Sequence, residues 1–433
     1  MNDRVAGIFR ADGRRSLPAE VKPVADPVLR IHSTPADIDA AAWNALLARQ
    51  PVPSPFMRHE YLLAMHDSGS AMPASGWTAS FATLWRGKTM VAACPLYLKD
   101  HSYGEYVFDW AWANAYEQHG LVYYPKAVVA VPFTPVPGSR LLARDAESRA
   151  LLVQGLIAFC KQAELSSLHL LFGADEDIAA CADAGLMLRH TVQFHWTNAR
   201  PAPVVDGEVD HAGDVAPLRY ADFDGFLASL SHEKRKKIRQ ERRKVADAGV
   251  RFRWARGSDI SAVDWDFFYR CYARTYLEHG NAPYLSRDFF HRMADTQPQT
   301  WLLFIAERDG KPIASSLIAL SDGRPDARGA DAPLVAYGRY WGALERVDCL
   351  HFEACYYQPL QWCIDHGVQR FEGGAQGEHK MARALMPVKT SSAHWLAHPA
   401  FADAVERFLE REGAGIDNYM DHLGERSPFK SAT

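Results

Sequence analysis

Several common sequence features are absent from this chain of 433 residues, and each absence excludes a class of protein. No apolar run approaches the roughly 18–20 residues that a membrane-spanning helix needs. The net charge of −4 is too small to give the whole molecule a field that attracts nucleic acid. The chain also has no H-E-x-x-H, G-x-S-x-G or Walker motif and no G-x-G-x-x-G after a strand. The usual zinc-protease, hydrolase and nucleotide-binding sites are therefore excluded.

Cysteine is present but has no recognisable pairing. The seven cysteines form no C-x-x-C pair and no metal-ligand spacing, and several lie in apolar runs where a buried reduced thiol is expected. Arginines near the N-terminus are mixed with Asp3 and Asp12, and no apolar segment follows them, so we expect no secretory signal. These features predict a reducing compartment, the cytoplasm, with residues 1–27 as a flexible leader.

What is present is a pattern of elements that occurs twice. The runs TASFATLW and TMVAACPLYL flank Arg86-Gly87-Lys88, and the runs TWLLFIAER and PIASSLIAL flank Asp309-Gly310-Lys311. Both arrangements predict β-hairpins with a Gly-containing turn. In each half a third strand, a helix, a short strand, a brief helix and a last strand follow. We expect them at 107–112, 147–164, 167–172, 176–184 and 188–197 in the first half, and at 334–341, 351–366, 369–372, 378–385 and 389–396 in the second.

This order predicts an α/β (α+β) fold with mixed sheets and helices on both faces. We assign residues 28–200 to a first domain, the Pro-, Gly- and acid-rich residues 201–214 to a linker, and residues 215–398 to a second domain. Residues 399–433 are expected to form C-terminal helices, one over 400–412 and a shorter one after Gly415. The alternative to a repeat is two generic α/β domains whose element order agrees by coincidence.

A strongly basic helix is expected near the start of the second domain. Between Lys234 and Lys244 lie eight basic residues, including Arg239 and Arg242, opposed there only by Glu241. This face can contact the phosphates of a nucleotide-linked donor or of tRNA. A solvated helix face, balanced by acidic residues elsewhere, explains the pattern equally well. The apolar residues expected along the buried stripe of the helix are Phe223, Leu227, Leu230, Ile238 and Val245.

The segment Glu372–Thr390 collects groups suited to chemistry at the end of the last central strand. Three glycines within five positions allow sharp bends and bring backbone N–H groups close to a ligand. A helix beginning near Gly377 adds positive potential for an anion or a developing oxyanion. Acidic, imidazole and ammonium groups follow, at the strand end where ligands bind in open α/β sheets. The alternative is a Gly-rich turn with exposed charges.

A metal site is not expected at His351 and Glu353. The two residues are two positions apart, so they do not share a helix face.

Three blocks of sequence resemble one family. LHFEACYYQPLQWCIDHG followed by FEGGAQGEHKMARALMPVKTSSAHW resembles the FemAB-like N-acyltransferases, often described as peptidoglycan biosynthesis or recognition proteins. YYPK with AVPFTPVPGSRLL resembles the first-domain signature of that family, and YLEHGNAPYLSRDFF resembles its second-domain loop. Together the blocks span roughly residues 56 to 395.

The resemblance implies a tandem pair of GNAT-like domains and transfer of an acyl or aminoacyl group to an amine acceptor, a small molecule or peptide such as a cell-wall precursor. It implies acyl-CoA or aminoacyl-tRNA as co-substrate, no tightly bound cofactor and no metal. Where ordinary GNAT enzymes carry an R/Q-x-x-G-x-G/A pyrophosphate loop, this chain has a single glycine between Gly342 and Asp348. Standard CoA binding is therefore in question, and the basic helix keeps contact with tRNA open.

Roles for individual residues follow from this hypothesis. His379 is the candidate general base because imidazole titrates near neutral pH, with Glu372 or Glu378 orienting it or taking the proton directly. Backbone N–H groups of the glycine segment can hold an oxyanion. The candidate donor-binding residues are Gly373, Gly374, Gln376, Gly377, Lys380, Lys389, Arg239 and Arg242.

The acceptor is expected to bind elsewhere, to Tyr124, Lys126, Thr134, Arg140, His279 and Tyr284. Core packing is the alternative for Tyr124, and solvated charge is the alternative for Lys126 and Arg140. A non-catalytic recognition protein on the same fold is the second function that the sequence leaves open, and a conventional acetyl-CoA enzyme is the third. The oligomeric state is not determined by the sequence.

Overall fold

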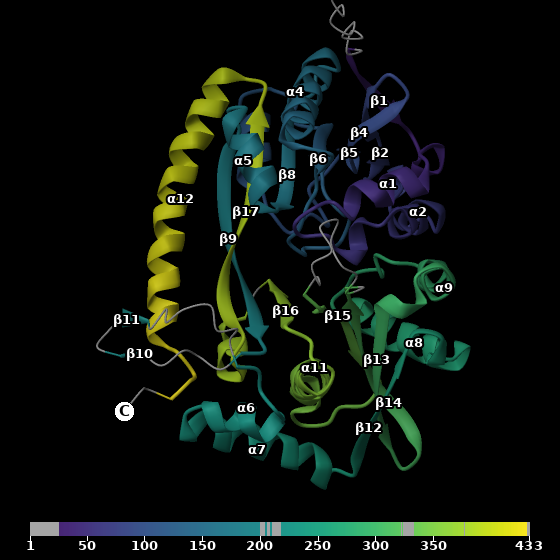
Figure 1. Cartoon of the computed structure of the whole chain (residues 1–433), viewed down its shortest axis with the longest axis vertical. Helices are drawn as coiled ribbons and strands as arrows, with labels where there is room; N and C mark the ends of the chain where they lie inside the picture. The colour runs from purple at the N-terminus through teal and green to yellow at the C-terminus, as the bar shows by residue number, and fades with distance from the viewer. Residues whose placement is uncertain are drawn as a thin grey trace, which may run out of the picture.

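The computed structural model describes residues 26–199, 204–205, 208–209, 218–321, 323, 333–375 and 377–430. Most of the predicted leader and linker, and the candidate residue Gln376, lie outside these described residues. The described part is an α/β structure in which helices cover both faces of a long mixed sheet (Figure 1). The predicted fold class is therefore confirmed.

The central sheet has eleven strands, and a smaller sheet of four strands packs beside it in the first half. The central sheet contains, in spatial order, β12 (Val250–Arg256), β13 (Trp301–Arg308), β14 (Lys311–Leu320), β15 (Val335–Ala343), β16 (Arg370–Ala375), β9 (Met187–Thr197), β17 (Met386–Leu396), β8 (Ser167–Gly173), β6 (Lys126–Val129), β5 (Leu96–Lys99) and β2 (Thr78–Ala79). The smaller sheet contains β1 (Pro27–His32), β3 (Phe81–Arg86), β4 (Thr89–Cys94) and β7 (Leu142–Ala143). A separate short hairpin is formed by β10 (Val204–Val205) and β11 (Glu208–Val209).

The two halves repeat one plan and exchange their last strands. Each half contains one parallel pair, β6 with β8 and β15 with β16. The strand that ends the first half, β9, pairs with β16 of the second half, and β17 pairs with β8 of the first. β9 and β17 also pair with each other over nine residues. The sheet is therefore continuous across the predicted boundary between the domains.

Helices occupy both sides of this sheet. They are α1 (Ala40–Leu47), α2 (His59–Asp67), α3 (Trp110–Gln118), α4 (Ala146–Gln162), α5 (Asp175–Asp183), α6 (Phe223–Ser229), α7 (His232–Asp247), α8 (Ala262–Glu278), α9 (Arg287–Thr296), α10 (Leu350–Phe352), α11 (Gln358–Asp365) and α12 (Pro399–Glu425). A π-helical turn, Glu353–Tyr357, joins α10 to α11, and a 3₁₀ segment, Glu378–Arg383, lies between β16 and β17. Shorter 3₁₀ turns are Pro35–Asp37, Pro55–Met57, Pro73–Ser75, Gly257–Asp259 and Pro298–Thr300.

Apolar side chains that alternate in direction along the strands of the second half contribute to two separate hydrophobic cores. Leu303 and Leu317 face the core that contains α8 and α9. Leu302 and Ile318, one position away on the same strands, face the core that contains α11. Since successive strand residues point to opposite faces, α8 and α11 cover opposite faces of the sheet.

Most of the predicted strands are found. Both hairpins are confirmed, since β3 pairs with β4 and β13 pairs with β14. The expected third strand at 107–112 is wrong, because Trp110 begins α3 and the strand position is taken by β6. Asp109, the residue before this helix, is buried and bound to Lys126 and Tyr123. This long-range contact fixes the segment as a loop followed by a helix.

The ends of the second half differ in two respects from the expectation. The five apolar residues expected on one basic helix are all buried, but they are divided between α6, α7 and Leu230 in the short connection between them. The two expected C-terminal helices form the single helix α12, which runs across β9 and β17 (Figure 1). Among the described residues, no helix is both long and apolar enough to cross a membrane.

Candidate active site

An opening in the central sheet lies between β15 and β16. The two parallel strands pair from Val335 and Arg370 to Tyr337 and Glu372, and then separate. Beyond this point β15 continues along β14, and β16 continues along β9. The backbone edges that face each other across the opening no longer pair in a ladder, and on the β16 edge the carbonyl oxygens of Gly373 and Gly374 accept hydrogen bonds from Lys380 instead.

Two cavities adjoin at this opening. The first, which we call the η7-side cavity after the 3₁₀ segment η7 (Glu378–Arg383), has a volume of about 150 Å³. The residues that line it are Ser316, Ile318, Gly338, Arg339, Tyr340, Trp341, His351, Cys355, Tyr356, Phe371, Gly373 and Lys380. The second, the α8-side cavity, has a volume of about 330 Å³ and is lined by Tyr272, Thr275, Tyr276, His279, Asn281, Arg339, Tyr340 and Trp341. The cavities share Arg339, Tyr340 and Trp341, and their other walls come from elements on opposite faces of the sheet.

Lys380 forms the cationic wall of the η7-side cavity. The residue is 6% exposed, and its Nζ donates to the carbonyl oxygens of Gly373 at 2.7 Å and Gly374 at 3.3 Å. Burial lowers the pKa of Lys380 to about 8. The absence of a side chain at Gly373 permits this close packing, because a Cβ there would lie 2.3 Å from Leu385 and 2.9 Å from the Phe194 carbonyl oxygen.

Glu372 lies on β16 and points to the face of the sheet opposite the η7-side cavity. It pairs in register with Tyr337, whose side chain faces the α8 core, so Glu372 points toward that face. One carboxylate oxygen bonds to Arg370 at 2.9 Å, and the other, Oε2, is buried without a hydrogen-bond partner. Burial raises the pKa of Glu372 to about 7. A buried carboxyl group that titrates near neutral pH and has an unused oxygen suits a general base.

His195 is the neighbour of Glu372 on β9 and does not compete for this role. The two residues are register partners across the antiparallel pair. Burial, with the positive charges of Arg370 and Lys380, lowers the pKa of His195 to about 3. His195 is therefore neutral at physiological pH and cannot form an ion pair with Glu372.

The candidate base His379 lies at the rim rather than in a cavity wall. Its side chain is exposed, its Nε2 is 3.5 Å from the Tyr356 hydroxyl, and its ring contacts Phe352 and Tyr356. Partial burial and the charges of Arg383 and Lys380 lower the pKa of His379. A different histidine, His351, lines the η7-side cavity, and burial lowers its pKa to about 4.

Other candidate donor residues lie at varying distances from the opening. Gly374 lies beside it, and Gly377 has φ of 99° at the start of the 3₁₀ segment, a conformation that favours glycine. Glu378 is exposed and binds the Tyr419 hydroxyl and Arg426 of the C-terminal region. Lys389 is exposed, pairs with Asp417 at 3.0 Å, and lines a separate groove beside α12.

The basic helix α7 packs against the walls of the η7-side cavity. It contacts the π-helical turn that holds Cys355 and Tyr356 and the 3₁₀ segment that holds Lys380. Arg242 is directed inward, where it binds Glu353 and Gln361 at 3.1 Å each. Arg239 is directed outward and is 53% exposed. The helix therefore combines an inward face with structural ion pairs and an outward face with solvated cations.

Three candidate acceptor residues lie beside the α8-side cavity. His279 lines it. Tyr284 stacks on Phe133 with ring centroids 4.6 Å apart. Thr134, from the first half, has its hydroxyl 3.4 Å from Nη2 of Arg339. The loop that contains Phe133 and Thr134 thus carries first-half residues to the opening in the second half.

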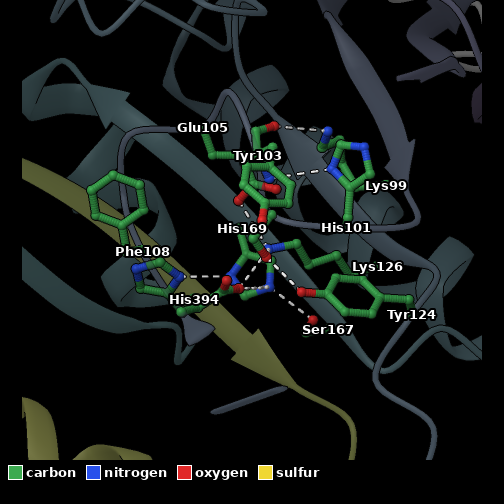
Figure 2. A network of polar contacts seen from close by, with 12 residues as sticks. Lys99, His101, Tyr103, Glu105, Phe108, Tyr124, Lys126, Ser167, His169 and His394 are labelled. Carbon is green, nitrogen blue, oxygen red and sulfur yellow. Dashed lines mark hydrogen bonds and ion pairs between the residues drawn. The ribbon is translucent and has the colours of Figure 1, made fainter. Parts of the chain in front are cut away.

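The remaining acceptor candidates belong to the first half: Tyr124 and Lys126 lie in one polar network there, whereas Arg140 lies near enough to Glu372 for its charge to lower the pKa of that carboxyl. Lys126 has no exposed surface, and its Nζ donates to Ser102 at 2.8 Å, Glu105 at 2.9 Å and Asp109. Tyr124 is partly buried and bonds to the same Ser102 at 2.8 Å. Tyr123 contacts His169. His169 in turn contacts His394 of β17 (Figure 2). This network ties β17 into the first half.

Arg140 lies beyond the parallel pair β6–β8 of the first half, the position that the opening beyond β15–β16 occupies in the second half. Its guanidinium donates to the carbonyl oxygens of Leu171 at 3.1 Å, Gly138 at 3.3 Å and Val136. Gly138 and Gly173 form a bridge that joins the two chain segments beyond the parallel pair. The first half therefore has an arginine where the second half has an opening.

Neither metal-binding nor disulfide chemistry is indicated in the described ranges. No cluster of three or more His, Cys, Asp or Glu residues there has the arrangement of a metal site. All seven cysteines are free, and five are buried.

The sequence missed residues that line the opening. Arg339, Tyr340, Trp341 and His351 come from a strand and a helix that are far in sequence from the segment Glu372–Thr390. A signal was available at Arg339, because a charged residue inside an otherwise apolar strand is unusual.

Comparison with known proteins identifies one family. The model of the FemAB-like family, described as peptidoglycan biosynthesis/recognition, matches residues 34–431. No curated protein sequence matches significantly. Among solved structures, FemX has 9% identity and a TM-score of 0.48, with 88% of this chain and 100% of that chain covered. L-PGS from Bacillus licheniformis has 10% identity and a TM-score of 0.47, with coverage of 86% and 97%. A tandem GNAT protein from the clavulanic acid biosynthesis pathway has 13% identity and a TM-score of 0.43, with coverage of 86% and 99%.

Proposed function

The chain belongs to the FemAB-like family of peptidoglycan biosynthesis/recognition proteins, and from this premise we propose that it is an N-acyltransferase. It transfers an acyl or aminoacyl group from an activated donor to an amine, and the acceptor is a peptidoglycan precursor. The observation that carries this proposal is the opening between β15 and β16, where cavities from opposite faces of the sheet adjoin. Such an opening lets a donor and an acceptor enter separately and meet at one point.

The donor is assigned to the η7-side cavity. Its acyl carbonyl would lie against the unpaired backbone edges of β15 and β16, where N–H groups can stabilise the oxyanion of a tetrahedral intermediate. Lys380, with a pKa of about 8, is protonated at neutral pH and can give a proton to the leaving thiolate or ribose oxygen. The cavity wall thus supplies electrostatic stabilisation and an acid.

The acceptor is assigned to the α8-side cavity, and Glu372, which points to the same face of the sheet but lies outside the lining of that cavity, is the base. A neutral amine attacks the acyl carbon and forms the new C–N bond while its proton passes to the carboxylate of Glu372. The intermediate then collapses, the bond to the donor's sulfur or oxygen breaks, and that atom takes a proton from Lys380. The Glu372 pKa of about 7 keeps a large fraction ionised at neutral pH.

The donor carries phosphate, as acyl-CoA or as aminoacyl-tRNA. Support comes from α7, which packs behind the η7-side cavity and directs exposed basic side chains outward. From Gly342, at the end of β15, to Asp348 the chain has a single glycine, which disfavours the usual CoA pyrophosphate loop. The extended basic face is therefore more consistent with a tRNA backbone than with a single pyrophosphate.

The test is an assay that supplies both donor types. The purified protein is incubated with acetyl-CoA or with a mixture of aminoacyl-tRNAs, together with a peptidoglycan precursor that has a free amine, and products are identified by mass spectrometry. We expect an amide product from aminoacyl-tRNA that is lost in Glu372→Gln. Precursor binding without any product from either donor would contradict the proposal and favour a recognition protein.

A further inference from the structure

Arg339 occupies an irregular position in β15. Leu317 pairs with Tyr340 and Ile318 pairs with Gly338, which leaves Arg339 as the extra residue of a β-bulge. A bulge bends the strand and redirects a side chain, and bulges occur often beside active sites. Here the redirected side chain lines both cavities at the opening.

The guanidinium of Arg339 is held in place by neutral groups. Its Nη2 donates to the Phe133 carbonyl oxygen at 3.0 Å and lies 3.3 Å from the Tyr340 hydroxyl. Its central carbon lies 5.2 Å from the ring centroid of Phe56 and 5.0 Å from that of Tyr340. These contacts fix the plane of the group, because ring faces and carbonyl oxygens attract a cation.

The positive charge of Arg339 is not neutralised within the described residues. No carboxylate there lies within ion-pair distance, and Nε is buried without a hydrogen-bond partner. A buried charged donor that lacks an acceptor costs on the order of 1–3 kcal/mol or more. Other inward arginines of this protein do have partners, for example Arg383 with Glu241 at 2.8 Å and Arg149 with Asp177 at 3.0 Å.

The α8-side cavity has the character of a site for a small anion. Its lining contains aromatic, hydroxyl, amide and imidazole groups and Arg339, but no aspartate or glutamate. A volume of about 330 Å³ matches a small organic molecule rather than a few waters. Because the lining has one permanent positive charge and no negative charge, a ligand with one negative group is the electrostatic complement.

We propose that Arg339 binds a carboxylate group of the acceptor, so that the substrate is an amine that also carries a carboxylate, as an amino acid or the end of a peptide does. This proposal rests on the proposed function only in calling the ligand an acceptor. A carboxylate fits better than a phosphate because the cavity offers one guanidinium, whereas a dianion would need a second charge. The planar guanidinium matches two carboxylate oxygens in geometry as well as in charge.

Matched ligands test the proposal without any donor. L-lysine and cadaverine differ by one carboxylate, as do L-alanine and ethylamine. Binding to the full-length protein is measured by calorimetry and by ligand-observed NMR, with inorganic phosphate as a third probe. We expect the carboxylate member of at least one pair to bind at least ten-fold more tightly, with Kd in about the millimolar range or below. Equal binding, no saturation by either carboxylate, or tighter binding of phosphate would overturn it.

Variants assign the preference to one side chain. Arg339→Gln should abolish the difference between L-lysine and cadaverine, and Arg339→Lys should keep part of it, because an ammonium group retains the charge but not the fork. Arg292→Gln, an exposed arginine of α9 that pairs with Asp288 and Asp67, is the control and should change nothing. Wild-type preference retained in a folded Arg339→Gln protein would exclude the assignment.

A measurement on the wild-type chain covers the case in which Arg339→Gln does not fold. In protein labelled with ¹⁵N-arginine, the Nε–H signal that Arg339→Lys removes should shift with L-lysine and not with cadaverine. An unshifted signal at saturating L-lysine would overturn the proposal. None of these experiments measures transfer, so carboxylate binding without product would refute the proposed function alone, and product without carboxylate preference would refute this inference alone.

Discussion

At the scale of single residues, Glu372 links stability to pH. Its folded-state pKa of about 7 lies above its ordinary value of 4.5, so the folded protein holds this proton more tightly than the unfolded chain does. The contribution of Glu372 to stability therefore falls as pH rises from about 4.5 to about 7 and stays low above that. We expect Glu372→Gln to raise the free energy of unfolding by about 1–3 kcal/mol at pH 8, and to change it little at pH 4.5.

Thermal unfolding at both pH values tests this expectation. Glu378→Gln is a matched control, because Glu378 is exposed. Equal destabilisation by Glu372→Gln at both pH values would mean that its contact with Arg370 outweighs the cost of burying the charge.

Two residues compete for the role of base, and their pH profiles separate them. If Glu372 is the base, Glu372→Gln lowers kcat by about two orders of magnitude, and kcat/KM of the wild type declines as pH falls through about 7. The sequence-based hypothesis instead expects His379→Ala to lower kcat by about the same factor. Since the pKa of His379 is lowered from 6.5, a profile controlled by it would decline only at more acidic pH. Unchanged kcat in folded His379→Ala would remove His379 from the mechanism.

Two lysines of the same segment should differ in their effect on the donor. Lys380 lines the η7-side cavity, whereas Lys389 lines a groove beside α12. We expect Lys380→Met to lower kcat/KM for the donor by about 10- to 100-fold, and Lys389→Met to change it less than two-fold. Steady-state kinetics with varied donor concentration is the measurement. Similar losses in both variants would contradict the assignment of the donor to this cavity.

The sequence indicated the contiguous residues of the candidate site and missed the residues that tertiary structure places beside them. Gly373 and Lys380 follow the strand in the order that a strand-end site requires, and both line the opening. The role of Arg339 depends on a bulge whose register is set by pairing with β14, which local composition does not encode. Likewise, the burial of Lys126 among three oxygen ligands needs contacts with residues up to 24 positions away.

At the scale of elements, α7 has two faces that should respond differently to mutation. Arg239→Glu changes the exposed face, so it should weaken a phosphate-rich donor and reduce the salt dependence of donor binding while stability stays the same. Arg242→Ala removes the charged partner of buried Glu353, leaving only the amide of Gln358, and should destabilise the fold by on the order of 1–3 kcal/mol. Filter binding at several salt concentrations and denaturant unfolding measure the two effects. Loss of stability in Arg239→Glu, or salt-independent donor binding, would leave α7 with a structural role only.

Helix α12 is longer than the sequence pattern predicts, and its glycines explain the difference. Three glycines, Gly413, Gly415 and Gly424, lie within it, and each disfavours a helix by about 1 kcal/mol relative to alanine. Tertiary contacts offset this cost, because Leu409 and Leu423 are buried and Asp417 pairs with Lys389. A reading of local propensity therefore breaks the helix where packing keeps it continuous.

At the scale of the whole molecule, the exchange of last strands makes the halves depend on each other. β9 completes the sheet of the second half, and β17 completes that of the first. We expect residues 26–200 and residues 215–430, expressed alone, to be unfolded or aggregated, since each would expose a long unpaired edge. Expressed together, they should assemble into a stable complex. Circular dichroism and size-exclusion chromatography are the measurements, and a cooperative thermal transition in either half alone would contradict the prediction.

The buried contact between His169 and His394 also limits how early the native sheet can form during synthesis. The two residues are 225 positions apart, and their side chains meet at 2.7 Å. A ribosome that adds roughly 5–20 residues per second needs roughly 10–45 s to make the intervening chain. During that interval the newly made β8 has no β17 to pair with. We therefore infer that the nascent first half has an unpaired strand edge during this interval, and that this protein acquires its native sheet only after β17 has been synthesised.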